Sequence, residues 1–227
     1  MLNRKKVIIA KEKTFCGYLF RFFAFLVIEP LIRLIWVKKV VGKEKLPKNG
    51  AYILAENHQS YFDWLTLYSI MSRRISFLAA EKLFTSKFWR PFMEYTGQIK
   101  VEREAEDKSV PFGLGLEILA SGQLLGIFPQ GTRSRSGKIE KTYTGVARLA
   151  LEARVPVVPV GVKNAFEVMA PSAKKPKFKK IIEIYFGEPM DFSRYYDMPK
   201  TKELYRQITN EIMTEVARLA GLKYVKE

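Results

Sequence analysis

The sequence predicts an α/β protein, with a mixed sheet flanked by helices and an N-terminal two-helix membrane-associating motif. Two observations carry this prediction. Short apolar runs bounded by Gly or Pro alternate with longer runs of helical periodicity, which is the pattern of strand–helix units. Before them stands one long aromatic and apolar run flanked by lysines. With 227 residues, of which 48% are hydrophobic, the chain can also bury a sizeable core.

The N-terminal run decides the domain organisation. We expect residues 1–39 to form a basic, aromatic membrane-binding motif and residues 40–227 to form the α/β domain. The run is long enough to cross a bilayer, but Arg21, Glu29 and Arg33 interrupt it, and a charge at the bilayer centre costs about 2.5–3.5 kcal/mol. Such a segment can instead dip into one leaflet, with its basic side chains reaching back to the lipid phosphates.

A proline divides this run. Because Pro30 breaks or kinks a helix, we expect two helices, at about 14–28 and 31–38, with a bend at Glu29–Pro30. The alternative is a helix pair that packs on the core of the protein itself. We favour membrane contact. The residues expected to make it are Arg4, Lys5, Lys6, Phe22, Phe23, Leu26 and Trp36.

The rest of the chain alternates between strand and helix patterns. The expected strands are 51–55, 75–80, 99–102, 124–128, 155–162 and 181–186, and the expected helices are about 60–72, 86–95, 108–121, 142–154 and 201–219. In the run VPVVPVGV, Pro156 and Pro159 have no N–H to donate, which predicts an edge strand or a strand start. This alternation favours one mixed sheet.

Charge and cysteine content limit the classes of function. The net charge is +16, and residues 1–48 alone carry +9, so an anionic partner is expected: nucleic acid, a membrane surface, or an acidic protein or substrate. A second basic stretch covers residues 163–180. The single cysteine excludes an internal disulfide, and one histidine with one cysteine makes a zinc site of these ligands very improbable.

The only histidine, His58, stands between an expected strand and an expected helix. That position is where α/β domains expose side chains to a crevice. Asp63 follows five residues later. If Ser60 caps the helix, Asp63 falls in its first turn and can point back at the imidazole. The same Ser60-x-x-Asp63 spacing is also a capping box, in which Asp63 only accepts from backbone N–H groups. Spacing alone leaves the two interpretations nearly even.

Two arginines point to a phosphate. Arg103 ends one expected strand, and Arg133 follows another after the turn at Gly131. Guanidinium groups near free backbone N–H groups suit a phosphate or a phosphate ester. A nucleotide P-loop is excluded, because no Gly-Lys-Ser/Thr ending is present.

Four motifs in order now carry a family resemblance. They are His58-x-x-x-x-Asp63, Gly97-x-Ile99-x-Val101-x-Arg103, Phe128-Pro129-x-Gly131-Thr132-Arg133-Ser134 and Val155-Pro156-Val157-Val158-Pro159-Val160. In order and spacing they resemble the motifs of the glycerolipid acyltransferases. The chain resembles the bacterial 1-acyl-sn-glycerol-3-phosphate (lysophosphatidic acid) acyltransferases over about residues 40–190. At Gln130 the family usually has glutamate.

The resemblance implies a function and roles for residues. It implies transfer of an acyl group from acyl-CoA or acyl carrier protein to the 2-hydroxyl of lysophosphatidic acid, which gives phosphatidic acid in phospholipid biosynthesis. His58 would be the general base and Asp63 would orient it, with no metal and no cofactor. Acceptor contacts are expected from Arg103, Gln130, Gly131, Thr132 and Arg133. The family pattern also places residues 155–160 beside the acyl donor, although that run is expected to be core.

Two alternatives stay open at this point. One is an acyltransferase that uses another lyso-lipid or glycerol-3-phosphate as acceptor. The other is a non-enzymatic peripheral protein that binds anionic lipids. Nucleic acid is not an expected partner, because charge alone suggests it and no recognition motif is present. We expect a monotopic or peripheral protein on the cytoplasmic face of the cytoplasmic or cell inner membrane.

Overall fold

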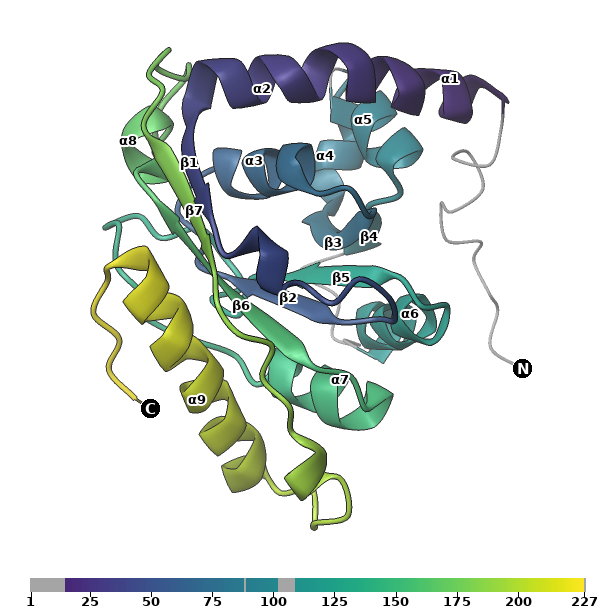
Figure 1. Ribbon diagram of the computed structural model, residues 1–227, viewed down its shortest axis with the longest axis vertical. Coiled ribbons are helices and arrows are strands. Elements are labelled where there is room, and N and C mark those ends of the chain that lie inside the picture. The colour runs from purple at the N-terminus through teal and green to yellow at the C-terminus, as the bar shows by residue number, and fades with distance from the viewer. Residues whose placement is uncertain (1–14, 88, 102–108, 227) are drawn as a thin grey trace.

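The computed structural model describes residues 15–87, 89–101 and 109–226 and shows a sheet covered by helices on both faces (Figure 1). Within these residues the sheet has seven strands in the order β1-β7-β6-β2-β5-β3-β4. Their bounds are β1 Val37–Val41, β2 Ile53–Glu56, β3 Ile75–Ala80, β4 Ile99–Val101, β5 Leu124–Ile127, β6 Val157–Lys163 and β7 Ile182–Phe186. The prediction of a mixed sheet flanked by helices is confirmed.

Strand direction divides the sheet into two parts. The five strands from β6 to β4 run parallel to one another. β7 is antiparallel to β6, and β1 is parallel to β7. The carboxyl ends of the five parallel strands therefore meet at one edge, where α/β proteins place their ligands.

The helices fall into two layers. Their bounds are α1 Phe15–Phe23, α2 Glu29–Trp36, α3 Phe62–Ile70, α4 Glu81–Thr85, α5 Trp89–Thr96, α6 Ser109–Ala120, α7 Gly145–Ala153, α8 Ala165–Val168 and α9 Lys202–Ala220, with a π-helical segment, η1, at Ala24–Ile28. The layer of α1 to α5 covers one face, and α6, α7 and α9 cover the other (Figure 1). Side chains of β2 alternate between two apolar cores, with Leu54 facing α3 and Ile53 facing α9.

The expected bend at Glu29–Pro30 is wrong. The backbone keeps helical angles from Phe23 through Glu29, and α1, η1 and α2 follow one another without a break. The N–H of Glu29 donates to the carbonyl oxygen of Ala24, five residues earlier, which is the π-helical pattern. Pro30 then lies in the first turn of α2, where its missing N–H costs little, and the wider turn before it gives room for its ring.

This helical segment, residues 15–36, exposes large apolar side chains and buries an acid. Phe22, Phe25 and Leu34 are 61%, 60% and 65% exposed, whereas Glu29 is buried. Glu29 pairs with the Nη2 of Arg33 at 3.1 Å, and the Nε of Arg33 donates to the carbonyl oxygen of Ser69 in α3. Within the described residues, no helix has both the length and the apolarity needed to span a membrane. An exposed apolar face of this extent marks an interaction surface.

Of the two positions predicted for residues 155–162, the edge strand is wrong, whereas the strand start fits Pro156, which stands directly before β6. β6 lies inside the sheet, between β7 and β2, and its valines are fully buried. Pro159 is tolerated because the pairing of β6 with β7 starts only at Val160, and the next contact on that side is a single bridge from Val157. At Pro159 only its carbonyl oxygen is used, accepting from the N–H of Gly187.

The N-terminal helical segment leads directly into the sheet. β1 begins at Val37, immediately after α2, so the expected division between residues 39 and 40 falls inside a strand. β1 was not expected, because its two lysines and its place after Trp36 suit the end of a helix. Among the described strands it pairs with β7 alone, which is distant in sequence.

Candidate functional site

After two neighbouring strands, the chain continues to opposite faces of the sheet. β2 and β5 are paired and parallel, but the chain leaves β2 toward α3 and leaves β5 toward α7 (Figure 1). A crevice forms at such a switch point, outside the carboxyl ends of the strands. The loop after β2 carries His58 and the loop after β5 carries Arg133, so the topology brings these two side chains to the same crevice.

Asp63 satisfies both interpretations of its spacing at once. Its Oδ2 lies 2.9 Å from the Nδ1 of His58, 2.6 Å from the backbone N of Gln59 and 2.7 Å from the backbone N of Ser60. Asp63 is fully buried in the first turn of α3. Ser60 caps the helix from outside, since its Oγ accepts from the N–H of Phe62 at 3.0 Å. The carboxylate therefore shapes the loop and orients the imidazole with one oxygen atom.

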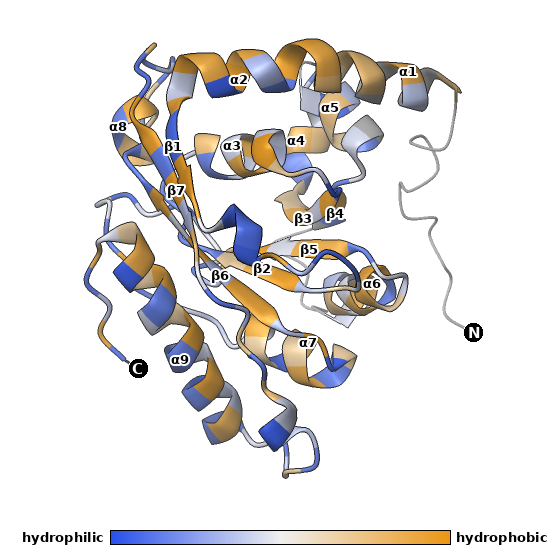
Figure 2. Cartoon of the chain, viewed as in Figure 1, coloured by the Kyte–Doolittle hydropathy of each residue, from blue (hydrophilic) through white to orange (hydrophobic). Residues whose placement is uncertain are grey.

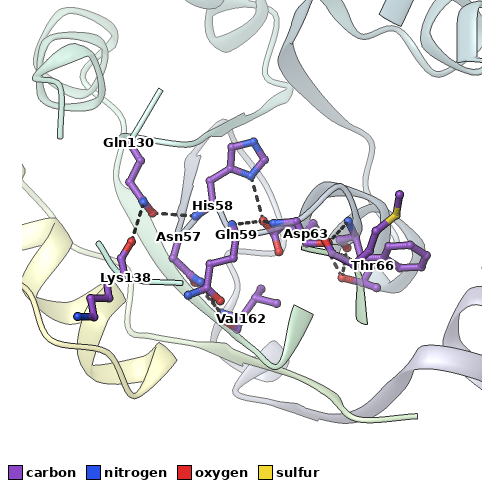
Figure 3. Close-up of polar contacts among 11 residues, drawn as sticks. Asn57, His58, Gln59, Asp63, Thr66, Gln130, Lys138 and Val162 are labelled. Atoms are coloured by element: carbon purple, nitrogen blue, oxygen red, sulfur yellow. Dashed lines mark hydrogen bonds and ion pairs between the residues drawn. The ribbon is translucent and has the colours of Figure 1, made fainter. Parts of the chain in front are cut away.

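The loop after β5 holds the histidine from its other side. The N–H of His58 donates to the Oε1 of Gln130 at 2.8 Å (Figure 3). The N–H of Ser134 donates to the carbonyl oxygen of His58 at 2.8 Å. Gln130 is buried, and its Nε2 donates to the carbonyl oxygen of Lys138 at 3.5 Å. The side chain of Gln130 thus bonds the backbone behind the histidine, and its expected acceptor contact stays a prediction.

The imidazole is fixed on its face as well as at its edge. The ring of His58 stacks on Phe128 with centroids 3.9 Å apart and planes 17° apart. Asn57 anchors the loop by two bonds to the backbone of Val162, at 2.9 and 2.8 Å. Because a carboxylate only accepts hydrogen bonds, Nδ1 carries the proton of the bond to Asp63, and Nε2 lies on the side of the ring away from that bond (Figure 3).

An apolar cavity of about 260 Å³ opens beside the imidazole. His58, Gly131 and Arg133 line it together with apolar side chains, among them Phe77, Leu78, Leu83, Met93 and Ile127. Gly131 has a φ of +69°, and a Cβ there would stand 3.0 Å from the ring of Tyr143, so this turn requires glycine. The cavity therefore joins one polar end to an apolar interior.

Arg133 presents a free donor at this polar end. Its guanidinium lies over the ring of Tyr61, 3.6 Å from the centroid. Its Nη1 is buried and has no hydrogen-bond partner in the part of the chain that the structure describes. Stacking holds the guanidinium plane while leaving N–H groups available, which suits an anionic oxygen.

The other expected site residues have different outcomes. Arg103, Arg4, Lys5 and Lys6 lie outside the described residues. Thr132 is exposed and does not line the cavity. Of the expected membrane contacts, the side chains of Phe22, Phe23 and Leu26 are exposed, and Trp36 is partly buried.

Sequence reasoning missed Lys82, Tyr61 and Phe128. Lys82 lines the cavity from α4, directly after β3, so it stands at the same sheet edge as His58 and Arg133. Its position after a strand that is parallel to β2 and β5 was the available indication. The roles of Tyr61 and Phe128 as ring platforms depend on contacts between distant loops, which spacing does not reveal.

A second buried carboxyl stands behind Asp63. Glu56 ends β2 on the face covered by α3, and burial together with the negative charge of Asp63 raises its pKa well above its ordinary value. Both oxygens of Glu56 and the Oδ1 of Asp63 have no hydrogen-bond partner among the described residues. The surroundings of Glu56 therefore favour its neutral form, while Asp63 accepts three hydrogen bonds. The described residues contain no group of three or more His, Cys, Asp or Glu that could hold a metal ion.

Comparisons with known proteins agree on one family. A family model described as Acyltransferase matches residues 38–163. A 1-acyl-sn-glycerol-3-phosphate acyltransferase of Bacillus subtilis (strain 168) is 29% identical over 168 residues, which are 73% of this chain and 80% of that protein. A yeast protein of the same name, from Saccharomyces cerevisiae, is 31% identical over 137 residues, 59% of this chain and 45% of its own length.

One solved structure has the same fold. The crystal structure of the 1-acyl-sn-glycerophosphate (LPA) acyltransferase, PlsC, from Thermotoga maritima superposes with a TM-score of 0.68. The match covers 93% of this chain and 88% of that chain at 22% sequence identity. At this identity the likeness establishes the arrangement of the strands and helices.

Proposed function

This chain belongs to the Acyltransferase family, and we propose that it transfers a fatty acyl group from an acyl thioester to the 2-hydroxyl of 1-acylglycerol-3-phosphate, giving phosphatidic acid. One observation carries the proposal: the imidazole that Asp63 orients and the guanidinium of Arg133 line the same apolar cavity. A base, an anion-binding group and space for an acyl chain are the three parts that this reaction needs. The names of the relatives support the choice of acceptor.

His58 would act as the general base. Its Nε2 takes the proton of the acceptor hydroxyl while that oxygen attacks the carbonyl carbon of the thioester. The new C–O bond forms, the C–S bond breaks, and the imidazolium returns its proton to the sulfur. A free thiol has a pKa of about 8.5, so the departing thiolate needs little assistance from an acid. Asp63 keeps the tautomer and stabilises the imidazolium.

Arg133 would hold the phosphate of the acceptor. Its Nη1 is an unpaired buried donor at the edge of the cavity, and a charge-assisted bond to a phosphate oxygen would satisfy it. Gly131 lets the backbone approach closely at this point because no Cβ intervenes. Lys82 adds a second positive charge from the carboxyl end of β3, at the same sheet edge. The apolar wall from Phe77 to Met93 would receive acyl chain.

The helical segment 15–36 would seat the enzyme on a bilayer. Its large exposed side chains are aromatic and aliphatic, while its acid, Glu29, is buried and bonded to the partly exposed Arg33. This arrangement suits a helix that lies in one leaflet, at the cytoplasmic face of the cytoplasmic membrane. A water-soluble enzyme would have to extract a lipid into solution, and an enzyme on the bilayer surface avoids that step. Acyl-CoA or acyl carrier protein would supply the donor from the aqueous side.

The test is thiol release from palmitoyl-CoA with lysophosphatidate in mixed micelles. We expect turnover by the parent chain and a loss of about 10²–10⁴-fold in His58→Ala, the range for removing a general base. Lys200→Ala, an exposed change before α9, serves as the control and should keep full activity. Thermal melts show that each variant is folded.

Other acceptors decide the finer part of the proposal. Glycerol-3-phosphate and lysophosphatidylcholine are offered in parallel, and lysophosphatidate should give the highest kcat/KM. A higher value with either of the others would overturn the acceptor and leave the acyltransferase chemistry in place. Equal thiol release by His58→Ala and the parent would overturn the assigned base.

A further inference from the structure

A basic loop stands apart from the candidate site. Residues 171–181, here called the lysine loop, connect α8 to β7 and contain no acidic residue. Its five lysines are all exposed, and no ion pair joins any of them to a carboxylate in the described residues. They are Lys174, Lys175, Lys177, Lys179 and Lys180. Five unpaired cations on one short loop predict an anionic partner.

The lysine loop is fastened to the end of α2. The indole Nε1 of Trp36 donates to the carbonyl oxygen of Lys177 at 2.9 Å, and the N–H of Lys177 donates to the carbonyl oxygen of Val168 at 2.9 Å. The ring of Phe178 stacks on Trp36 with centroids 5.6 Å apart. Trp36 in turn packs on Phe62, the first residue of α3, at 4.7 Å. The loop is thus held in place relative to the helical segment 15–36.

The loop and the helical segment border one another. In Figure 1 the loop rises above α8, beside the end of α2, and in Figure 2 its hydrophilic colour adjoins the mostly hydrophobic helices. Phe178 is 75% exposed in the middle of the lysines. An exposed aromatic ring among cations suits the interface of a bilayer, where the ring enters the headgroup level and the ammonium groups meet phosphates. An acidic protein would match the charges and leave this ring unexplained.

We propose that the lysine loop is a second membrane contact, which binds anionic phospholipid headgroups beside the apolar face of the helical segment 15–36. The proposal rests on the membrane contact of that segment in the proposed function. Two separate contacts fix the rotation of the molecule on the bilayer, which one helix lying in a leaflet leaves open. Headgroup binding by the loop therefore sets the direction in which the cavity faces.

Vesicle binding of two matched variants tests this proposal. In one, Lys174, Lys175, Lys179 and Lys180 are all replaced by Gln. In the other, the exposed Lys200, Lys202, Lys223 and Lys226, at and beyond the ends of α9, are replaced by Gln. Both variants lose four positive charges, so net charge is matched. Vesicles are phosphatidylcholine alone or equal parts of phosphatidylcholine and phosphatidylglycerol.

We expect the loop variant to bind the phosphatidylglycerol vesicles at least tenfold more weakly than the parent, since one basic residue near an anionic surface contributes about fivefold. The α9 variant should stay close to the parent, and binding to phosphatidylcholine should be the same for all three. The loss should shrink at high salt. A third variant, Phe178→Ser, should weaken binding to both kinds of vesicle, because the ring contributes without charge.

Three results would overturn the proposal. The first is that the loop variant binds the vesicles as well as the parent does. The second is that the α9 variant loses as much vesicle binding as the loop variant. The third is that the loop variant loses binding only to an acidic acyl carrier protein and not to vesicles. Thiol release in neutral mixed micelles separates this proposal from the proposed function. The loop variant should match the parent there, and a silent parent would defeat the catalytic proposal without bearing on the vesicle result.

Discussion

The loop at residues 57–63 and the helical segment 15–36 are opposites in polarity. In the loop, polar side chains are buried: Asn57, His58 and Asp63 are all less than one-tenth exposed and hydrogen-bonded. In the helical segment, large apolar side chains are exposed, and the buried polar group is Glu29, paired with Arg33. Each region reverses the usual placement of its residue types.

The two regions differ in where the partners of these unusually placed side chains come from. In the loop the protein itself supplies nearly every partner, which costs stability only where an oxygen such as the Oδ1 of Asp63 is left over. In the helical segment no described part of the protein covers the apolar side chains, so an outside apolar phase must do so. A closed polar network is therefore suited to chemistry, and an open apolar face to attachment. The following four predictions separate the two regions.

Asp63→Asn should give the largest effect. The amide cannot accept from Nδ1 of His58 and two backbone N–H groups with one charged oxygen, so the imidazole loses its tautomer. We expect kcat to fall by about 10³–10⁴-fold, as when the aspartate of a catalytic triad is replaced. Vesicle binding should be unchanged. Loss of binding together with activity would show that the two regions are not independent.

The reciprocal change removes apolar surface from the helical segment. Replacing Phe22, Phe25 and Leu34 by Ser should weaken binding to phosphatidylcholine vesicles by about 10²-fold, since a buried large apolar side chain contributes about 1.5–3 kcal/mol and these would be buried in part.

The matched control places serine at three exposed apolar residues elsewhere. These are Val110, Met198 and Val225, which are 53%, 48% and 80% exposed. Sedimentation with vesicles should show no change for this control. Unchanged sedimentation of the helical variant would mean that its apolar face meets something other than lipid.

Gln130→Ala should lower stability moderately. The buried N–H of His58 loses its acceptor, which costs about 1–3 kcal/mol of unfolding free energy. Gln130→Glu keeps an oxygen at that position and should cost less. Urea unfolding of the two variants measures this order. The reverse order would indicate that the amide donation to the carbonyl oxygen of Lys138 is the more important bond.

Glu56→Gln should give the smallest effect at low pH and a growing one at high pH. The raised pKa means that the folded state keeps a proton that the unfolded chain releases. The unfolding free energy of the parent protein therefore falls as the pH rises above about 4.3, the pKa of glutamate in the unfolded chain. Glutamine does not titrate, so the unfolding free energy of the variant should rise relative to that of the parent between about pH 5 and pH 8.

Thermal melts of Glu56→Gln and the parent across that range measure the difference between them. If the melting temperatures of the two proteins change in parallel with pH, the pKa of Glu56 is not raised in the folded state. Glu188→Gln provides an exposed control, because that side chain is 75% exposed and should show little pH dependence of this kind.

The sequence predicted the strands of the sheet except the edge strand β1. Strands such as 75–80 and 124–128 are short apolar runs. Because both faces of these strands are buried, nearly every residue is apolar, and the run can be recognised in the sequence. β1 reads Val-Lys-Lys-Val-Val and pairs only with a strand far along the chain, so nothing local identifies it. Pro159 gave a wrong prediction of an edge strand for the same reason. It is tolerated because β7 pairs with β6 only from Val160 on, and the local sequence does not show where a distant strand ends.

The site was predictable where spacing is local. His58 and Asp63 lie in one loop and the first turn of one helix, and the structure brings them together. Gln130 was placed in the acceptor site because it belongs to a motif, whereas its side chain turns to the backbone of His58. A motif fixes which loop a residue belongs to, and the rotamer depends on the loop packed against it. Lys82 shows the converse, since it belongs to no quoted motif and yet lines the cavity.

The junction of the helical segment with the sheet has a kinetic consequence. α2 continues into β1 without a linker, Arg33 is bonded to α3, and Trp36 packs on Phe62. The cavity therefore cannot swing on a tether, and if the segment lies in a bilayer as proposed, the fold would set the height of the cavity above it. For a lipid acceptor dissolved in that bilayer, the concentration that matters is its mole fraction in the leaflet. Diluting the acceptor with inert lipid should slow the enzyme, whereas diluting the whole suspension with buffer should not, as long as the protein stays bound.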